Sequence, residues 1–151
     1  MSDATLATRK AFIRANTRAL PVPSLGLSIF TADELTPIWA ATERDLAKYN
    51  VAPPFCAFPW AGGQALSHYV LDHPEILRGK RVLDLASGSG LVAIAAAKSG
   101  AADVLANDID PMCEAAIAVN SELNGVAVSY IAGDLLAADL PAVDVILAAD
   151  V

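Results

Sequence analysis

Few residues in this chain can coordinate a metal ion or form disulfide bonds. Its 151 residues include two cysteines, Cys56 and Cys113, and two histidines, His68 and His73. Two cysteines provide no disulfide framework, so we expect a reducing compartment. The four side chains also lack the spacing of a metal site, and we expect both histidines to be structural or at the surface. The sequence therefore predicts a protein without a metal cofactor.

Positive charge and long apolar runs are also scarce. The chain has 10 Lys and Arg residues against 17 Asp and Glu, a formal net charge of -7. Nucleic-acid binding needs clustered Lys and Arg, so we expect no nucleic-acid partner. No apolar run is long enough to span a bilayer, so we expect no membrane partner. The acidic balance suits a basic partner such as a lysine-bearing protein surface, although it can equally serve solubility alone.

Apolar residues are abundant, at 55% of the chain, which is enough for the core of one domain. From Arg81 onwards, short apolar runs alternate with helical stretches. The predicted strands are 81–85, 103–107, 127–132 and 143–148, and the predicted helices are 91–99 and 112–123. This alternation predicts an α/β fold, a Rossmann-like doubly wound parallel sheet with right-handed crossovers. Ligands of such sheets bind at the carboxyl ends of the strands.

The residues before this core predict an N-terminal helical extension. Residues 2–20 are basic, and their apolar side chains recur every seven positions, at Leu6, Ile13 and Leu20. We expect an amphipathic helix of the mature chain that ends at Pro21 and Pro23, the alternative being an organelle transit peptide. A short extended piece over 24–30 and a helix over 64–71 follow. We therefore divide the chain into an extension and lid region, 1–75, and a cofactor-binding core, 76–151.

The core begins with a short strand and a turn of small residues, R-V-L-D-L-A-S-G-S-G from Arg81 to Gly90. Gly88 and Gly90 have no Cβ, so the backbone can approach a ligand closely. Together with Ala93 they fit the dinucleotide fingerprint G-x-G-x-x-G/A, and Asp108 follows Gly88 by 20 residues, as that fingerprint requires. A tight turn without any ligand remains the other explanation.

A second interpretation starts at the acid, because Asp84-x-Ala86-x-Gly88-x-Gly90 resembles the first motif of the class I, seven-strand S-adenosylmethionine methyltransferases. That resemblance implies that Asp84 serves the amino-acid part of the cofactor and that the turn, including Ser87, lies against it. A carboxylate at this place would repel a pyrophosphate, which favours S-adenosyl-L-methionine over NAD. Ala86 departs from the glycine of the motif.

Each predicted strand ends in an acid, and these acids are Asp84, Asp108, Asp134 and Asp150. We expect them to form an acidic rim at one edge of the sheet. Asp108 can accept both ribose hydroxyls, Ile109 beside it can pack on the adenine, and Asp134 can accept from the adenine amine. For Asp134, a simple turn residue is the alternative.

Two further runs resemble the family 16 protein methyltransferases: F-P-W-A-G-G-Q-A-L-S-H-Y-V-L-D-H-P (Phe58 to Pro74) and L-A-N-D-I-D-P (Leu105 to Pro111). Within that family they most resemble the lysine methyltransferases of the electron transfer flavoprotein β-subunit and their bacterial relatives. The resemblance covers Trp39 to Val151. It implies cofactor contacts at Trp60, Ala86, Gly88, Asp108, Asp134 and Ala149.

The same resemblance implies that Asp150 opens a D-x-x-Y motif near the transferred methyl group and takes the catalytic role. It implies methyl transfer to a lysine side chain of a protein, the electron transfer flavoprotein β-subunit. A small-molecule N-methyltransferase, an NAD-dependent oxidoreductase and a non-catalytic binding module stay open. We expect the cytoplasm of a bacterium or the mitochondrial matrix of a eukaryote. Only four of the seven strands are present, so we expect a core truncated at its C-terminus.

Overall fold

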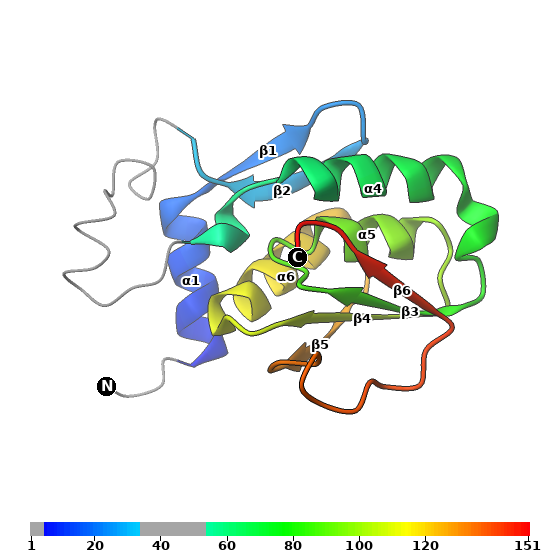
Figure 1. Ribbon diagram of the computed structural model, residues 1–151. Helices are drawn as coiled ribbons and strands as arrows, with labels where there is room; N and C mark the ends of the chain where they lie inside the picture. The colour runs from blue at the N-terminus through cyan, green and yellow to red at the C-terminus, as the bar shows by residue number, and fades with distance from the viewer. Residues whose placement is uncertain (1–4, 34–53) are drawn as a thin grey trace.

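The computed structural model describes residues 5–33 and 54–151 (Figure 1). A parallel sheet lies at its centre, and its strands are β3 (Arg81–Leu85), β4 (Asp103–Asp108), β5 (Ser129–Ala132) and β6 (Val145–Ala148). Their order is β5-β4-β3-β6. The register pairs Leu85 with Asn107 on one side and with Ala148 on the other, so the carboxyl ends of the strands meet at one edge. The predicted Rossmann-like α/β fold with a parallel sheet is confirmed.

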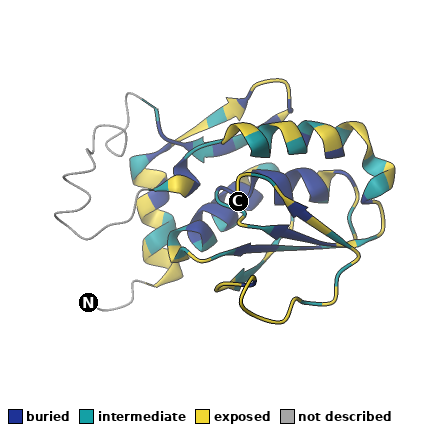
Figure 2. Cartoon of the chain, viewed as in Figure 1, coloured by how far each residue is buried: buried dark blue, intermediate teal, exposed yellow. Residues whose placement is uncertain are grey.

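Two helices connect these strands and cover one face of the sheet. They are α5 (Leu91–Lys98) and α6 (Pro111–Asn124), close to the predicted ranges. Six residues of α5 are buried and five of these six are small or β-branched, which lets the helix approach the sheet closely. The side chain of Asp110 accepts from the backbone N–H of Met112 at 2.8 Å, and Pro111 occupies the first helical position, so the start of α6 is fixed locally. Figure 2 shows the buried residues concentrated where α5 and α6 meet the sheet.

Helix α4 (Ala61–Asp72) packs against α5 and follows the 3₁₀ turn η1 (Phe55–Ala57). A second 3₁₀ turn, η2 (Pro74–Ile76), leads from α4 to β3. The helix begins three residues earlier than predicted, so Gly62 and Gly63 belong to its first turn and not to a flexible connection. The first N–H groups of a helix have no partner within it, so the N–H groups of these two residues can bind a side chain from elsewhere in the chain.

The N-terminal helix is shorter than predicted, and a strand takes the place of its last turn. Helix α1 spans Leu6–Asn16, and the antiparallel strands β1 (Arg18–Val22) and β2 (Leu27–Thr31) follow. The prediction that the helix continues to Leu20 and ends at the prolines is wrong. The hydroxyl of Thr17 donates to the Ile13 carbonyl at 2.5 Å and closes the helix, while Pro21 is accommodated in a strand of a two-stranded sheet.

Helix α1 is an integral part of this fold, because it packs along α6. The core side chain Ile13 is 1% exposed. Arg9 pairs with Glu114 at 2.5 Å and Arg14 with Glu122 at 2.6 Å, and Lys10 also contacts Glu122. Partly exposed ion pairs of this kind contribute about 0–1 kcal/mol each, so they fix the register of the two helices more than they stabilise them.

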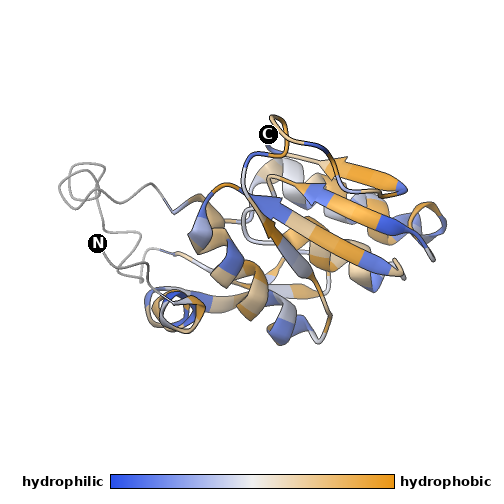
Figure 3. Cartoon of the chain, turned by 90° about the horizontal axis from the view of Figure 1, so that it is seen from below, coloured by the Kyte–Doolittle hydropathy of each residue, from blue (hydrophilic) through white to orange (hydrophobic). Residues whose placement is uncertain are grey.

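The two faces of the sheet differ in their covering. Within the described residues, no helix covers the face opposite α5 and α6, and apolar strand residues are visible there (Figure 3). Ile146 of β6 is 45% exposed. None of the helices in the described ranges is both long and apolar enough to cross a membrane.

Candidate functional site

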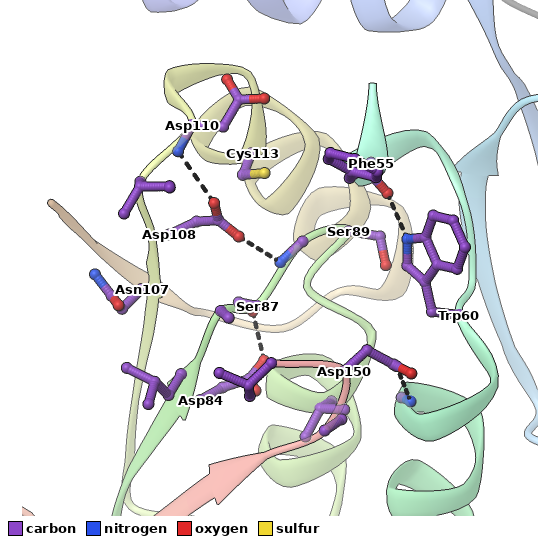
Figure 4. Close-up of a pocket in the computed structure, with 18 of the residues that line it drawn as sticks. Phe55, Trp60, Asp84, Ser87, Ser89, Asn107, Asp108, Asp110, Cys113 and Asp150 are labelled. Carbon is purple, nitrogen blue, oxygen red and sulfur yellow. Dashed lines mark hydrogen bonds between the residues drawn. The ribbon is translucent and has the colours of Figure 1, made fainter. Parts of the chain in front are cut away.

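A cavity of about 700 Å³ opens at the carboxyl edge of the sheet (Figure 4). Its walls come from the turn after β3, the end of β4, residues 134–136, the end of β6 and the aromatic segment before α4. All predicted site residues except Gly90 line it, namely Trp60, Asp84, Ala86, Ser87, Gly88, Asp108, Ile109, Asp134, Ala149 and Asp150. A volume of this size suits a ligand as large as a nucleoside with an amino-acid chain.

Gly90 serves packing behind the cavity. It precedes α5 with φ 82°, and a Cβ at this position would lie 3.0 Å from the side chain of Ile117 in α6. The glycine therefore allows the turn to lie directly on α6. The sequence motif correctly predicts a glycine that the turn requires. Gly90 is required for packing against Ile117, however, and not for contact with a ligand in the cavity.

Ala86 takes up the left-handed conformation that the motif normally assigns to glycine. Its φ is 54°, the same value as Gly88. The backbone N–H of Ser87 donates to the carbonyl of Asn107 at 2.8 Å and anchors the turn to β4. The turn geometry is thus retained in spite of the alanine, at the cost of local strain.

Asp84 is a buried carboxylate in the wall of the cavity, and it lies one residue before the end of β3. It is 1% exposed, and its Oδ2 accepts from the Ser87 hydroxyl and from the Ala93 N–H at 3.0 Å. Burial raises the pKa of Asp84 to about 7, although the two hydrogen bonds oppose the shift. A cationic group in the cavity would favour the ionised form.

Asp108 at the end of β4 is held in a fixed orientation by two backbone N–H groups. Its Oδ2 accepts from Gly88 at 2.9 Å and its Oδ1 accepts from Asp110 at 3.0 Å (Figure 4). Each carboxylate oxygen keeps a further acceptor position. The side chain can therefore receive two hydroxyl groups without losing its own supports.

Asn107, which the sequence analysis missed, positions the neighbouring turn. Its Nδ2 donates to the carbonyls of Ile131 at 2.9 Å and Gly133 at 2.8 Å, so it joins the ends of β4 and β5. Asp134 follows this turn, and its Oδ1 accepts from the Leu136 N–H at 2.9 Å. The place of Asn107 directly before Asp108 was the available signal for its role.

Large apolar side chains surround the mouth of the cavity. Trp60 is 46% exposed, and its Nε1 donates to the Phe55 carbonyl at 2.9 Å. Its ring lies 6.1 Å from that of Phe55 and 5.8 Å from that of Phe58. Ile109 and Leu136 are 75% and 74% exposed on other sides of the cavity. Phe55 and Leu136 were not predicted, and a bound ligand would cover part of this apolar surface.

Asp150 lies at the end of β6 and contacts the start of α4. Its Oδ1 accepts from the Gly62 N–H at 3.1 Å and its Oδ2 from the Gly63 N–H at 2.7 Å. No local pattern predicts this contact, because Gly63 and Asp150 are 87 residues apart in the chain.

Ionisable groups of the cavity wall are predominantly acidic. None of the described residues that line it is Lys, Arg or His. Within the ranges 5–33 and 54–151, no three His, Cys, Asp or Glu side chains are grouped as a metal site would require. Cys56 and Cys113 are both buried and free.

The sequence matches one protein family over most of this region. A profile of the ribosomal protein L11 methyltransferase (PrmA) family matches residues 64–149. The electron transfer flavoprotein β-subunit lysine methyltransferase of Rattus norvegicus is 48% identical over 121 residues, covering 78% of this chain and 46% of the relative. The protein of the same name from Homo sapiens is 47% identical over 115 residues, covering 76% and 44%. The chain thus spans about half the length of these relatives.

Solved structures of methyltransferases show the same fold. The ribosomal protein L11 methylase of Lactobacillus delbrueckii subsp. bulgaricus is similar with a TM-score of 0.53 and 33% identity, over 60% of this chain and 47% of that one. The Trypanosoma brucei PRMT1 enzyme–prozyme complex with AdoHcy is similar with a TM-score of 0.51 and 25% identity, over 57% of this chain and 28% of that one.

Proposed function

Because this chain belongs to the ribosomal protein L11 methyltransferase (PrmA) family, we propose that it forms the S-adenosyl-L-methionine-binding part of an enzyme that methylates lysine side chains of a protein. The single observation that supports this most is the buried carboxylate of Asp84 beside the glycine turn, in a cavity whose described lining contains no basic side chain.

The charge of the cavity favours a cationic cofactor over a dinucleotide. Asp84 and Asp108 both face the space next to Gly88, and a pyrophosphate there would be repelled by two carboxylates. The ammonium of an amino-acid chain instead offers Asp84 the opposite charge. Asp108 has acceptor capacity for two ribose hydroxyls, and Ile109 presents an apolar surface to a planar base. Asp134 has an acceptor for an exocyclic amine.

The remaining wall suits a lysine side chain. Trp60 and Phe55 provide apolar surface for the aliphatic part of lysine, and the Asp150 carboxylate lies on the same side of the cavity. A carboxylate there attracts an ammonium group and can orient the free amine by accepting a hydrogen bond. The cofactor supplies an electrophilic sulfonium methyl group, so the chain itself needs to provide proximity and orientation.

We propose the electron transfer flavoprotein β-subunit as the substrate. The support is the identity of 47% and 48% to two relatives that bear this name, together with a net charge of -7, which suits a lysine-bearing surface. Two buried free cysteines fit a reducing compartment, and we place the protein in the bacterial cytoplasm or, in a eukaryote, the mitochondrial matrix.

The test is a methylation assay with the full-length protein, labelled S-adenosyl-L-methionine and either purified electron transfer flavoprotein or a mixture of small amines. We expect label on a lysine of the β-subunit, located by mass spectrometry. Label that appears only on small amines would replace this proposal with a small-molecule N-methyltransferase. Binding of NAD without binding of S-adenosyl-L-methionine would exclude a methyltransferase altogether.

A further inference from the structure

A single side chain joins the end of β6 to the start of α4. Both carboxylate oxygens of Asp150 accept N–H groups of the first helical turn, from Gly62 and Gly63. Trp60 precedes this turn at the N-cap position and makes no side-chain capping bond. Asp150 therefore caps the helix from a distant part of the chain, and the positive end of the helix dipole favours its negative charge.

The space for this carboxylate exists only because residue 62 has no side chain. A Cβ at Gly62 would lie 2.6 Å from Oδ1 and 2.9 Å from Cγ of Asp150, which is too close for any contact. A Cβ at Gly63 would lie 3.7 Å from Oδ2, an ordinary contact distance. Glycine is otherwise unfavourable within a helix by about 1 kcal/mol relative to alanine. The contact with Asp150 supplies the reason for glycine at position 62.

From this difference we infer that Gly62 is a positioning residue, whose missing side chain allows Asp150 to dock on α4 and hold its carboxylate toward the cavity in one orientation. The inference rests on the proposed function, in which Asp150 orients the acceptor amine. Each oxygen uses one acceptor position on the helix and keeps another for a ligand. Figure 4 shows Asp150 between the start of α4 and the cavity. The two hydrogen bonds from Gly62 and Gly63 to Asp150 also fix the start of α4, directly after Trp60.

A double-mutant cycle on the full-length protein tests the contact itself. We expect Gly62→Ala to lower the midpoint of thermal unfolding by roughly 5 °C. In the Asp150→Ala background the same substitution should cause no further loss, because the clashing carboxylate is gone. Gly63→Ala is the matched control in the same turn, and its effect on the midpoint should be the same with and without Asp150. If Gly62→Ala costs as much in the Asp150→Ala background as in the wild type, the inference is wrong.

Turnover distinguishes positioning from a merely structural role. Gly62→Ala should lower kcat for the protein substrate about tenfold or more, while the dissociation constant of S-adenosylhomocysteine changes by less than about threefold. A general weakening of the fold would affect ligand affinity as well. Wild-type kcat in Gly62→Ala, or an equal loss in Gly63→Ala, would overturn the inference.

The two proposals fail in different ways. If the wild-type protein binds no S-adenosylhomocysteine, the proposed function fails and the turnover experiment has no meaning. The thermal cycle would still decide whether Gly62 makes room for Asp150.

Discussion

The carboxylate of Asp108 accepts a hydrogen bond from the backbone N–H of Gly88 at 2.9 Å. The end of β4 is thereby tied to the turn after β3, although the two residues are 20 positions apart. The turn and the acid are therefore one unit, and a change in either alters the shape of the cavity between them. A contact with the ligand is therefore only one reason for an acid 20 residues after Gly88. The second reason is the hydrogen bond by which Asp108 holds the glycine turn.

The first prediction concerns the affinity for the cofactor. Asp108→Ala removes a charged acceptor for two ribose hydroxyls and should weaken binding of S-adenosylhomocysteine by about 2–3 kcal/mol, or roughly 30- to 150-fold. Isothermal titration calorimetry on the full-length protein measures this directly. Asp103→Ala, at the other end of β4, is the control and should leave the affinity unchanged. Unchanged affinity in Asp108→Ala would show that the ribose is not bound here.

The second prediction concerns the strained alanine of the turn. Left-handed backbone costs a residue with a Cβ roughly 1–2 kcal/mol, and glycine adds about 0.4–1 kcal/mol of chain entropy in the unfolded state. Ala86→Gly should therefore raise the free energy of unfolding by about 0.5–1 kcal/mol, since Ala86 has φ 54° and an exposed side chain.

Ala102→Gly is the control for this gain, because Ala102 is also exposed but has no positive φ. At Ala102 glycine relieves no backbone strain and only increases the conformational entropy of the unfolded chain. Ala102→Gly should therefore lower the free energy of unfolding. Chemical denaturation of both variants gives the comparison. If Ala86→Gly lowers the free energy of unfolding as Ala102→Gly does, Ala86 is not strained.

The sequence sufficed for the regular part of the fold because its signals are local. The alternation of apolar runs and helical stretches after Arg81 located all four parallel strands, and Pro111 marked the start of α6. The strand-end acids were also visible, since their positions follow from the strands. The cavity residues Asp84, Asp108 and Asp134 could be predicted for this reason.

The sequence did not suffice where a distant partner decides the local structure. Gly62 and Gly63 have the composition of a flexible connection, but Asp150 caps them and makes them helical. Residues 18–22 continue a helical pattern and contain a proline, yet they pair with β2, which is held on α6 by the hydrogen bond from the Phe30 N–H to Asn120. In both places tertiary hydrogen bonds outweigh local propensity.

The third prediction concerns Asn120, a fully buried residue of α6 that joins three parts of the chain. Its Oδ1 accepts from the Phe30 N–H at 2.7 Å, and its Nδ2 donates to the Ser89 carbonyl at 2.8 Å. Asn120→Ala leaves both backbone groups without this partner and should lower the free energy of unfolding by about 2–4 kcal/mol. The control is Asn16, which is only partly buried and donates to the carbonyl of Phe12 in its own helix. Asn16→Ala should lower the free energy of unfolding, measured by chemical denaturation, by about 0.5 kcal/mol or less. Equal losses in Asn120→Ala and Asn16→Ala would contradict the bridging role of Asn120.

The fourth prediction concerns the pH dependence of stability, and it starts from the pKa of Asp84, which burial raises to about 7. In the unfolded chain the same group has an ordinary pKa of about 4. Between these values the folded protein holds a proton that the unfolded chain has lost, so the free energy of unfolding falls as pH rises and then levels off above about pH 7. Asp84→Asn should abolish this part of the pH dependence. Identical slopes of stability against pH in wild type and Asp84→Asn would contradict the raised pKa.

The same ionisation predicts how pH affects the binding of S-adenosylhomocysteine. An ammonium near Asp84 stabilises the ionised carboxylate, so binding below pH 7 must expel the proton that the free protein holds. The affinity should therefore rise roughly tenfold from pH 6 to pH 7.5, which corresponds to one protonated group with a pKa of about 7. Calorimetry in two buffers with different ionisation enthalpies would detect the released proton. Asp84→Asn should bind more weakly and release none. An affinity that is independent of pH in the wild type, with no buffer dependence, would place the ammonium elsewhere in the cavity.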